Sequence, residues 1–292
     1  MIPKRIEMPV QVEEILGKLR EHGYEAFAVG GCVRDAILGR IPGDWDITTS
    51  AHPEEVKQVF GHTIDTGLQH GTVTVMRDHI GYEITTYRID GEYEDGRHPK
   101  EVVFTAELRE DLRRRDFTIN AMAYSHETGI VDIFGGAEDL AARRIRCVGD
   151  AGERFTEDAL RILRAVRFSA QLGFSIEKKT WQALCELAPS LVHVSKERVQ
   201  VELTKTLLSD RPEFIWKTEA AGLAPYISKT FPEVFAAWKK QKSCAKQRLE
   251  EKVYSKNVPA ADKDAIKTET VAQQGHMFVK HECETDMAGE IS

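Results

Sequence analysis

Two stretches near the N-terminus decide how this 292-residue chain is interpreted: residues 25–35 are EAFAVGGCVRD and residues 44–48 are DWDIT. The first five of these residues have the composition of a short strand, and the pair Gly30-Gly31 ends it. A helix is predicted over 33–38 and a second strand over 44–48. The segment therefore predicts a strand, a glycine turn, a helix and another strand in close succession.

The glycine turn has the chemistry of a phosphate-binding turn. Gly30 and Gly31 carry no side chains, so backbone N–H groups can approach a phosphate closely. The helix after the turn would point the positive end of its dipole at the same place. Arg34 lies one turn into that helix, within reach of phosphate oxygens. A glycine pair alone usually makes only a turn, so this interpretation depends on the residues that come after the helix.

Asp44 and Asp46 supply the second part of the predicted site. Residues i and i+2 of a strand point to one face, so these carboxylates would repel each other unless a cation lies between them. Oxygen ligands of this kind suit Mg²⁺. An isolated pair is more often a polar strand end, but after a glycine turn it indicates nucleotide transfer. Glu83, in a β-rich run, either completes the acidic cluster or faces solvent.

A run of arginines begins at Arg113, and residues 113–121 read RRRDFTINA. Guanidinium groups bind phosphate with two parallel hydrogen bonds, so Arg115 and its neighbours could hold a nucleotide. The alternative is a solvated basic turn, which would be preferred if nothing else in the chain indicated nucleotides.

Residues 157–167 read EDALRILRAVR and place acidic and basic side chains on one predicted helix. Asp158 and Arg161 are three residues apart and would be neighbours, with Arg164 and Arg167 continuing the same ridge. The simpler interpretation is surface ion pairing. The functional interpretation is base reading: a carboxylate accepts from the exocyclic amine of cytosine or adenine, and a guanidinium donates to their ring acceptors. Uracil and guanine present the wrong groups along that edge.

The predicted fold class is α+β, with a mixed α/β head, an all-helical neck and part of a helical body. Further elements are expected in the head as helices over 9–22 and 53–60, and strands over 72–76, 80–88 and 101–105. From about residue 137 the pattern changes to helices, which are expected over 137–144, 156–172 with Thr156 as N-cap, 178–187 and 195–208. The predicted domains are a head over 1–147, a neck over 148–210, a remnant of a body over 211–238 and a polar, poorly ordered tail over 239–292.

Composition limits the class of protein further. The formal net charge is -7 and the pI about 5.9, which argues against sequence-independent coating of nucleic acid but not against a local basic groove. The five cysteines are scattered without a disulfide or metal-ligand spacing, which favours the reducing cytoplasm. No N-terminal leader and no membrane span is predicted. Nothing in the sequence specifies an oligomeric state.

Taken together and in order, these motifs resemble those of the bacterial-type (class II) tRNA nucleotidyltransferases, the CCA-adding enzymes of the poly(A) polymerase superfamily. The matching segments within residues 10–225 are a catalytic motif at 30–35 and 44–46, a ribose motif at 114–121, a hinge motif at 132–136, a nucleotide template at 157–161, and a last neck motif at 195–198 with Glu202. The resemblance implies a polymerase β-like head. It also implies that the 3′ end of tRNA is the acceptor and that CTP and ATP are the donors.

The resemblance also implies a mechanism, in which the tRNA 3′-hydroxyl attacks the α-phosphate and pyrophosphate leaves. It implies roles for nine residues: Asp44 and Asp46 as catalytic residues and Mg²⁺ ligands, Gly31, Arg34 and Arg115 for the triphosphate or sugar, Asp158 and Arg161 for the base, and Arg164 and Arg167 in support of these. The loop 90–99 resembles the loop that family members need for A addition, which favours full CCA addition.

Two alternative functions stay open. Members of this family usually continue into helical body and tail domains that hold the tRNA, whereas here the pattern fades after about Pro225, so we expect a shortened or divergent relative. Such a chain could bind nucleotide or RNA with little activity. A poly(A) polymerase ranks lower, because residues 63–73 lack the basic, aromatic run expected after the metal motif.

Overall fold

The structure is a computed structural model that describes residues 3, 5–91, 102–233 and 236. Residues Met1–Ile227 form one compact unit, and Ser228–Ser292 form a second. All of the helices and strands named below belong to the first unit. The predicted tail, 239–292, and the predicted loop beyond Gly91 lie outside the described residues.

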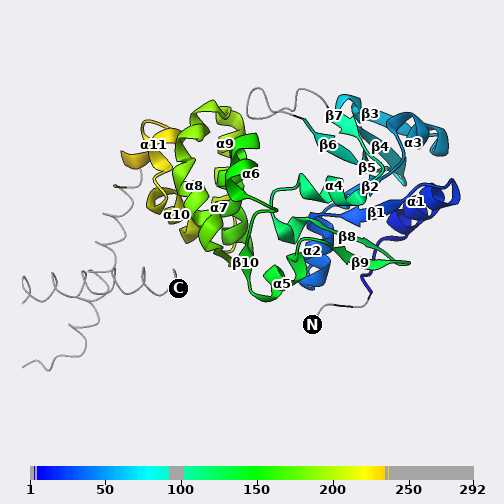
Figure 1. Ribbon diagram of the computed structural model, residues 1–292, viewed down its shortest axis with the longest axis horizontal. Helices are drawn as coiled ribbons and strands as arrows, with labels where there is room; N and C mark the ends of the chain where they lie inside the picture. The colour runs from blue at the N-terminus through cyan, green and yellow to red at the C-terminus, as the bar shows by residue number, and fades with distance from the viewer. Residues whose placement is uncertain (1–2, 4, 92–101, 234–235, 237–292) are drawn as a thin grey trace, which may run out of the picture. The chain divides into compact units, whose positions relative to one another are not determined.

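A seven-stranded mixed sheet organises the head (Figure 1). In spatial order its strands are β3 (Thr63–Gly67), β4 (Thr72–Arg77), β5 (Ile80–Thr86), β2 (Ile47–Thr49), β1 (Ala26–Val29), β8 (Met122–Ser125) and β9 (Gly129–Asp132). Neighbouring strands are antiparallel except β2 and β5, which pair in parallel. β1 and β8 are buried at every residue, because each lies inside the sheet with a strand on both sides.

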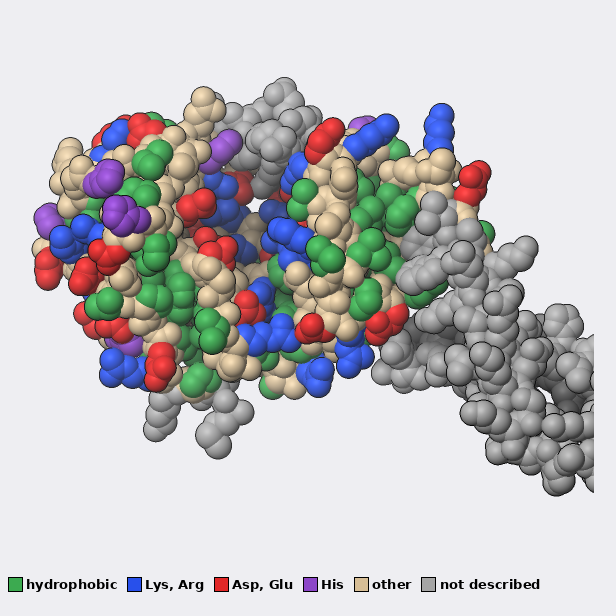
Figure 2. Space-filling view, turned by 180° about the vertical axis from the view of Figure 1, so that it is seen from behind, with side chains coloured by type: hydrophobic (Ala, Val, Ile, Leu, Met, Phe, Trp, Pro, Cys, Tyr) green, Lys and Arg blue, Asp and Glu red, His purple; other side chains and the backbone are tan. Residues whose placement is uncertain are grey.

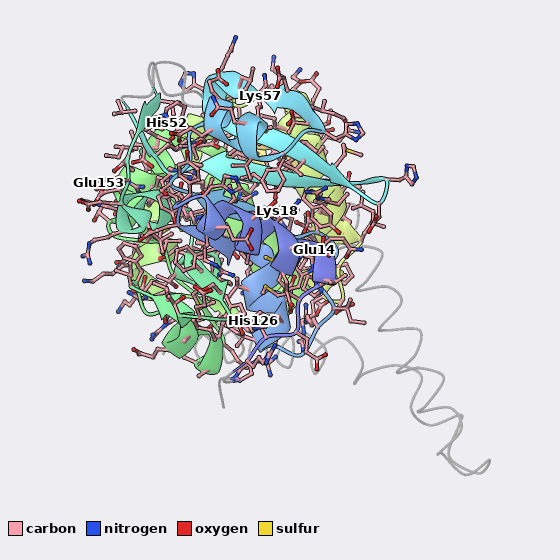
Figure 3. The ribbon with its side chains drawn as sticks, turned by 90° about the vertical axis from the view of Figure 1, so that its right-hand side faces the viewer. Glu14, Lys18, His52, Lys57, His126 and Glu153 are labelled. Atoms are coloured by element: carbon pink, nitrogen blue, oxygen red, sulfur yellow. The ribbon has the colours of Figure 1, made fainter. Side chains whose placement is uncertain are left out.

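The head helices are α1 (Val10–Glu21), α2 (Gly31–Ile37), α3 (Pro53–Val59), α4 (Leu108–Arg113) and α5 (Gly136–Ala141), with the short 3₁₀ helices η1 (Leu68–His70) and η2 (Thr118–Asn120). α1 buries an apolar stripe of Val12, Ile15, Leu16 and Leu19. Glu14 and Lys18 lie on its opposite, exposed face (Figure 3). Two small sheets complete the head region: β6 (Arg88–Asp90) with β7 (Val102–Phe104), and β10 (Arg144–Ile145) with β11 (Ser175–Ile176).

Helices come next in the chain, as predicted for a neck: α6 (Ala151–Glu157), α7 (Leu160–Leu172), α8 (Lys178–Glu186), η3 (Ala188–His193) and α9 (Lys196–Leu207). The segment predicted as a remnant of a body contains η4 (Pro212–Ile215), α10 (Trp216–Ala220) and α11 (Ala224–Ile227). α7 is buried along most of its length and packs against α9 and η4. The strand β11 interrupts the otherwise helical neck and pairs in parallel with β10 of the head. The boundaries at 147 and 210 stay predictions, since both lie within one compact unit.

One helix predicted from the sequence is two helices in the structure. The expected helix over 156–172 is broken at Asp158 and Ala159, between α6 and α7. Thr156 is not an N-cap: it lies in the last turn of α6, and its hydroxyl donates to the Gly152 carbonyl at 2.8 Å. Asp158 breaks the helix because its carboxylate accepts the Leu160 N–H at 3.0 Å, which competes with helical backbone hydrogen bonding.

Smaller differences concern where elements begin and end. The strand predicted over 44–48 begins only at Ile47, so Asp44 and Asp46 precede β2. The run over 80–88 splits at Tyr87 into β5 and β6, and the helix over 137–144 ends at Ala141. The strands β3, β8 and β9 were not predicted. β8 is buried at every residue and so shows no alternation, which periodicity alone does not separate from other buried segments. β3 is a mostly polar, exposed strand at the edge of the sheet, and β9 is a four-residue strand at the other edge.

Candidate active site

The glycine turn lies between β1 and α2, as the sequence predicted. Gly30 has φ 84° and ψ -129°, a conformation that strongly favours glycine. A Cβ built at Gly30 would lie 3.1 Å from Nη1 of Arg115. The turn and the arginine run, 85 positions apart in the sequence, therefore meet at one place. Helix α2 begins at Gly31, two residues earlier than predicted.

Three carboxylates lie near this turn. Asp44 and Asp46 are exposed on either side of the buried Trp45, so they share the solvent-facing side of an extended segment. Ile84 is paired with Ile47, which places Glu83 beside Asp46 in the parallel register of β5 and β2. Desolvation raises the pKa of Asp46, the charges of Asp44 and Glu83 raise it further, and Arg115 opposes them. Glu83 is thus exposed, but the strand register and its effect on Asp46 both place it close to that carboxylate.

The described residues contain no preformed cluster of three or more His, Cys, Asp or Glu side chains with metal-binding geometry. The donor set nevertheless suits a hard divalent cation, because it consists of carboxylate oxygens. Their mutual repulsion raises the pKa of Asp46, and a cation between them would relieve it. The residues therefore fit a metal on charge and ligand chemistry.

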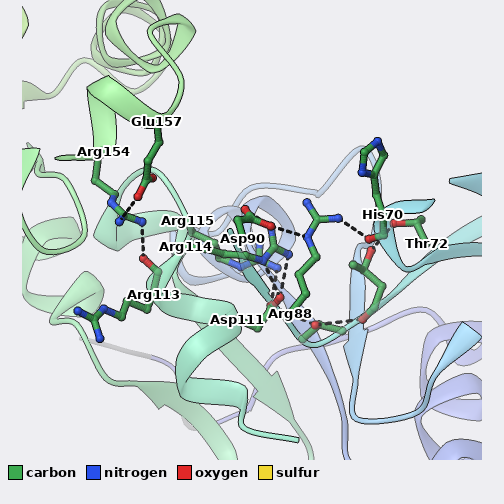
Figure 4. A network of polar contacts seen from close by, with 12 residues as sticks. His70, Thr72, Arg88, Asp90, Asp111, Arg113, Arg114, Arg115, Arg154 and Glu157 are labelled. Carbon is green, nitrogen blue, oxygen red and sulfur yellow. Dashed lines mark hydrogen bonds and ion pairs between the residues drawn. The ribbon is translucent and has the colours of Figure 1, made fainter. Parts of the chain in front are cut away.

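Asp111 anchors the arginine run, and the sequence interpretation missed it. Its buried carboxylate accepts from Arg114 Nε at 2.9 Å and Nη2 at 2.7 Å, from Arg115 Nη2 at 3.2 Å and from the Thr48 hydroxyl at 3.1 Å (Figure 4). Burial alone would raise the pKa of Asp111, but Arg114 and Arg115 together lower it. The spacing of Asp111 three and four residues before these arginines, on a short helix, was the available signal.

Arg115 is therefore fixed beside the acidic cluster with part of its guanidinium unused. Its buried Nε has no hydrogen-bond partner among the described residues. Its charge acts on Asp46, and its Nη1 lies against the Gly30 turn. Arg115 thus places a fixed positive charge between the turn and the carboxylates, where it could attract an anion.

Arg34 points into the protein. Only 8% of it is exposed, and it donates from Nε and Nη2 to Asp35, at 2.9 and 2.8 Å, and from Nη1 to Oδ1 of Asn120 at 2.6 Å. These bonds use three of its five N–H hydrogens and leave one on each terminal nitrogen. Cys32 of the same motif packs behind the turn, where burial raises its pKa to about 12, so this thiol stays neutral.

Asp158 and Arg161 do not form a helical i,i+3 ion pair, contrary to the sequence interpretation. Asp158 lies in the break before α7, and its Oδ2 accepts from Arg198 Nη2 at 2.8 Å. Arg161 donates from Nη1 to Glu157 at 2.6 Å. Each therefore has a different partner. Arg198, which the sequence placed in the last neck motif without a role in reading the base, pairs with Asp158 at this site.

Arg164 and Arg167 do not share one exposed ridge, because Arg167 is buried and Arg164 is only partly exposed. Arg164 forms an ion pair with the buried Asp116 at 2.7 Å, and Arg167 with the buried Glu202 at 2.5 Å. Burial alone would raise the pKa of Asp116, but Arg164, Asn120 and Arg161 lower it to about 2.

Neck arginines hold the 113–116 segment of the head. Arg154 donates to the carbonyl of Arg113 at 3.1 Å, and Arg161 donates to the carbonyl of Arg114 at 2.9 Å. Figure 4 shows Arg154 between Glu157 and the Arg113 carbonyl. In Figure 2, Lys and Arg side chains gather in a hollow between the two lobes of this face. A basic cleft thus exists in a chain whose net charge is -7.

Comparisons with known proteins agree with this geometry. A family model described as Poly A polymerase head domain matches residues 26–146, and one described as Probable RNA and SrmB- binding site of polymerase A matches residues 173–229. The chain is 54% identical over 202 residues to the CCA-adding enzyme of Leuconostoc mesenteroides, covering 69% of this chain and 50% of that enzyme. It is 53% identical over 214 residues to the CCA-adding enzyme of Geobacillus thermodenitrificans, covering 73% and 53%.

Solved structures give the same result. The Bacillus stearothermophilus CCA-adding enzyme in complex with CTP matches with a TM-score of 0.71 and 44% identity, over 76% of this chain and 54% of that one. The Thermotoga maritima CCA-adding enzyme complexed with tRNA matches with a TM-score of 0.62 and 26% identity, over 74% and 51%. The chain spans about half the length of the curated relatives it matches.

In the part of the chain that the structure describes, no helix is long and apolar enough to cross a membrane. The ordered motifs, the fold and these matches show that the chain belongs to the family of the CCA-adding enzymes within the poly(A) polymerase superfamily.

Proposed function

We propose that this protein adds C, C and A to the 3′ end of tRNA from CTP and ATP. The observation that carries the proposal is the convergence of the Gly30 turn, the carboxylates of Asp44 and Asp46, and the partly unused guanidinium of Arg115. In the reaction, the terminal 3′-oxygen of the tRNA forms a bond to the α-phosphorus, and the bond from that phosphorus to pyrophosphate breaks. A tRNA substrate fits a cytoplasmic protein whose described cysteines are all free.

Asp44 and Asp46 would hold Mg²⁺, and Glu83 is placed to contribute to the same negative site. When bound, the metal would activate the attacking hydroxyl and stabilise charge on the leaving group. Arg115, beside the turn, would donate to the triphosphate or the sugar. The two remaining N–H hydrogens of Arg34 and the backbone at Gly31 would bind phosphate oxygens. Positioning and fixed charge would supply most of the rate enhancement.

Base selection would depend on the polarity of two side chains. Asp158 forms an ion pair with Arg198 at 2.8 Å, and a carboxylate can only accept hydrogen bonds, which suits the exocyclic amine of cytosine or adenine. Arg161 would donate to the ring acceptors of the same bases, held in place by Glu157 and by the Arg114 carbonyl. Arg164 and Arg167 would support them through their ion pairs with Asp116 and Glu202.

The test is product length on three tRNA substrates, ending before the first C, after one C and after CC, with CTP, ATP and Mg²⁺. We expect each to be completed to CCA and no further, and we expect chelation of divalent metal to stop the reaction. Asp44→Ala should abolish extension while leaving the fold intact, because Asp44 is exposed. Failure of the unmodified protein to extend any of the substrates would overturn the proposal.

The same experiment separates the alternatives. Binding of CTP without extension would support a nucleotide- or RNA-binding relative. Addition of many A residues to an arbitrary RNA would indicate a poly(A) polymerase. Addition that stops at CC, or that occurs only on the substrate ending in CC, would narrow the activity to C addition or to A addition.

A further inference from the structure

Three guanidinium groups surround a single aromatic ring where α7 meets the head. The Cζ atoms of Arg34, Arg164 and Arg167 lie 5.1, 5.3 and 4.0 Å from the centroid of the Phe168 ring. All three distances are within the range of cation–π attraction. Phe168 is 5% exposed, so little water weakens these contacts. Phe168 itself does not bind nucleotide or metal in the proposed reaction.

The charges around the ring are balanced. Each guanidinium has one carboxylate partner, with closest N–O distances of 2.8 Å for Arg34–Asp35, 2.7 Å for Arg164–Asp116 and 2.5 Å for Arg167–Glu202. The carboxylates take N–H groups, which lie at the edge of a guanidinium, and this leaves its face available to the ring. Three like charges can therefore pack closely without an unpaired cation.

The ring also connects two parts of the proposed site. Arg34 belongs to α2, which begins at the phosphate-binding turn, whereas Arg164 and Arg167 belong to α7, which begins at the proposed base readers. The head contacts Phe168 a second time through Phe117, edge to face at 5.8 Å. Asn120 bridges the same groups, since it accepts from Arg34 and donates to Asp116, the partner of Arg164.

We propose that Phe168 is a positioning residue for nucleotide selection, whose ring holds the head's Arg34 and the neck's Arg164 and Arg167 so that α2 and α7 keep one spacing. This inference rests on the proposed function for its nucleotide, but not for its structural part. Without the aromatic face, Arg34 and Arg164 lose a shared neighbour. The distance between the start of α7, where the base would be read, and the start of α2, where the triphosphate would be held, is then no longer fixed.

The test compares Phe168→Leu with Phe174→Leu. Leucine keeps an apolar side chain and removes the aromatic face in both variants. Phe174 is the matched control, because it too is 5% exposed but contacts a single guanidinium, that of Arg143 at 5.7 Å. Phe168→Tyr retains an aromatic face and is the rescue variant. For each protein we would measure hydrogen exchange of the α2 amides without ligand, and CTP and UTP affinity with Mg²⁺ present.

We expect Phe168→Leu to speed exchange in α2, because all three cation–π contacts are lost. CTP binding should weaken roughly fivefold to tenfold, because only part of this loss reaches the nucleotide site. UTP binding should weaken less, so the preference for CTP should fall. In the extension assay, KM for CTP should rise more than kcat falls. Phe174→Leu should leave α2 exchange and the CTP preference unchanged, and Phe168→Tyr should restore most of both.

Unchanged α2 exchange in Phe168→Leu, or an equal loss in Phe174→Leu, would overturn the inference. Failure of the proposed function is distinguishable from this outcome. If the unmodified protein extends no tRNA, the function is wrong, while exchange in α2 still decides whether Phe168 couples the two helices.

Discussion

Single residues in this head are restricted by backbone packing as much as by chemistry. Gly136, at the start of α5, shows this outside the site. A Cβ built there would lie 2.3 Å from the carbonyl oxygen of Thr118 and 2.9 Å from Cγ of Met122. Both N–H groups at the helix start, those of Gly136 and Ala137, donate to Asp132 at 2.8 Å. The segment that resembles the hinge motif is thus tightly packed against η2.

We expect Gly136→Ala to lower the free energy of unfolding by about 1–3 kcal/mol, because backbone has to move to admit the methyl group. Gly17→Ala is the control: Gly17 lies inside α1 with nothing within 4 Å of a built Cβ, so alanine there should stabilise by up to about 1 kcal/mol. Urea unfolding of both variants measures this. Equal effects of the two substitutions would contradict it.

At the scale of elements, the break between α6 and α7 is the feature with most consequence for the site. It removes Asp158 from the helix, so that the carboxylate accepts both the Leu160 N–H and the Arg198 guanidinium. The residues of the sequence motif are therefore divided between a helix end and a helix start. The Leu160 hydrogen bond holds the carboxylate at the N-terminal end of α7, where positive backbone charge favours an anion.

Asp158→Asn should separate the two roles of this residue. The amide oxygen can still accept the Leu160 N–H, but the amide nitrogen can donate to O4 of uracil. We expect preference for CTP over UTP, measured as the ratio of kcat/KM values, to fall on the order of tenfold. Asp150→Asn is the control, since Asp150 also accepts a backbone N–H at a helix start, that of Glu153 at the start of α6, at 3.0 Å. A fall of the same size in Asp150→Asn would count against base reading.

At the scale of the whole described unit, buried ion pairs join head to neck. Asp116 directly precedes Phe117, which forms an isolated bridge with Cys147, and Arg164 belongs to α7. The pKa of Asp116 is lowered to about 2, so its proton binds more weakly in the folded than in the unfolded protein. Its contribution to stability is therefore present above about pH 4 and is lost as the pH falls towards 2.

Lowering the pH from 5 to 3 should reduce the free energy of unfolding by about 1 kcal/mol through Asp116 alone. Urea unfolding at both pH values measures the loss. In Asp116→Asn, which cannot titrate at this position, the loss should be smaller by that amount, even though the variant is less stable at every pH because Arg164 is left unpaired. If the two proteins lose equal stability, Asp116 is not the group responsible.

Much of the fold could be predicted because its signals are local. The stripe in α1, the strand before Gly30 and the neck helices follow from periodicity and turn residues. A predicted helix boundary was wrong where a side chain competes with the backbone for hydrogen bonds, as at Asp158. Strands such as β8 were missed because they are buried at every residue and have no alternation to detect. Asp111 and Phe168 were missed because their importance lies in the groups that gather around them.

The amino-acid sequence specifies the residue types of the site and their order: a glycine turn, paired carboxylates, an arginine run and the Asp158 motif. Each of these motifs depends on a spacing of a few residues, because local backbone geometry places residues at such spacings on one face or in one turn. Tertiary packing alone brings Arg115 against Gly30, makes Glu83 act on Asp46, and gives the charged residues of α7 partners in other elements. The physical reason is that a buried charge takes whichever partner satisfies it, and long-range packing selects that partner.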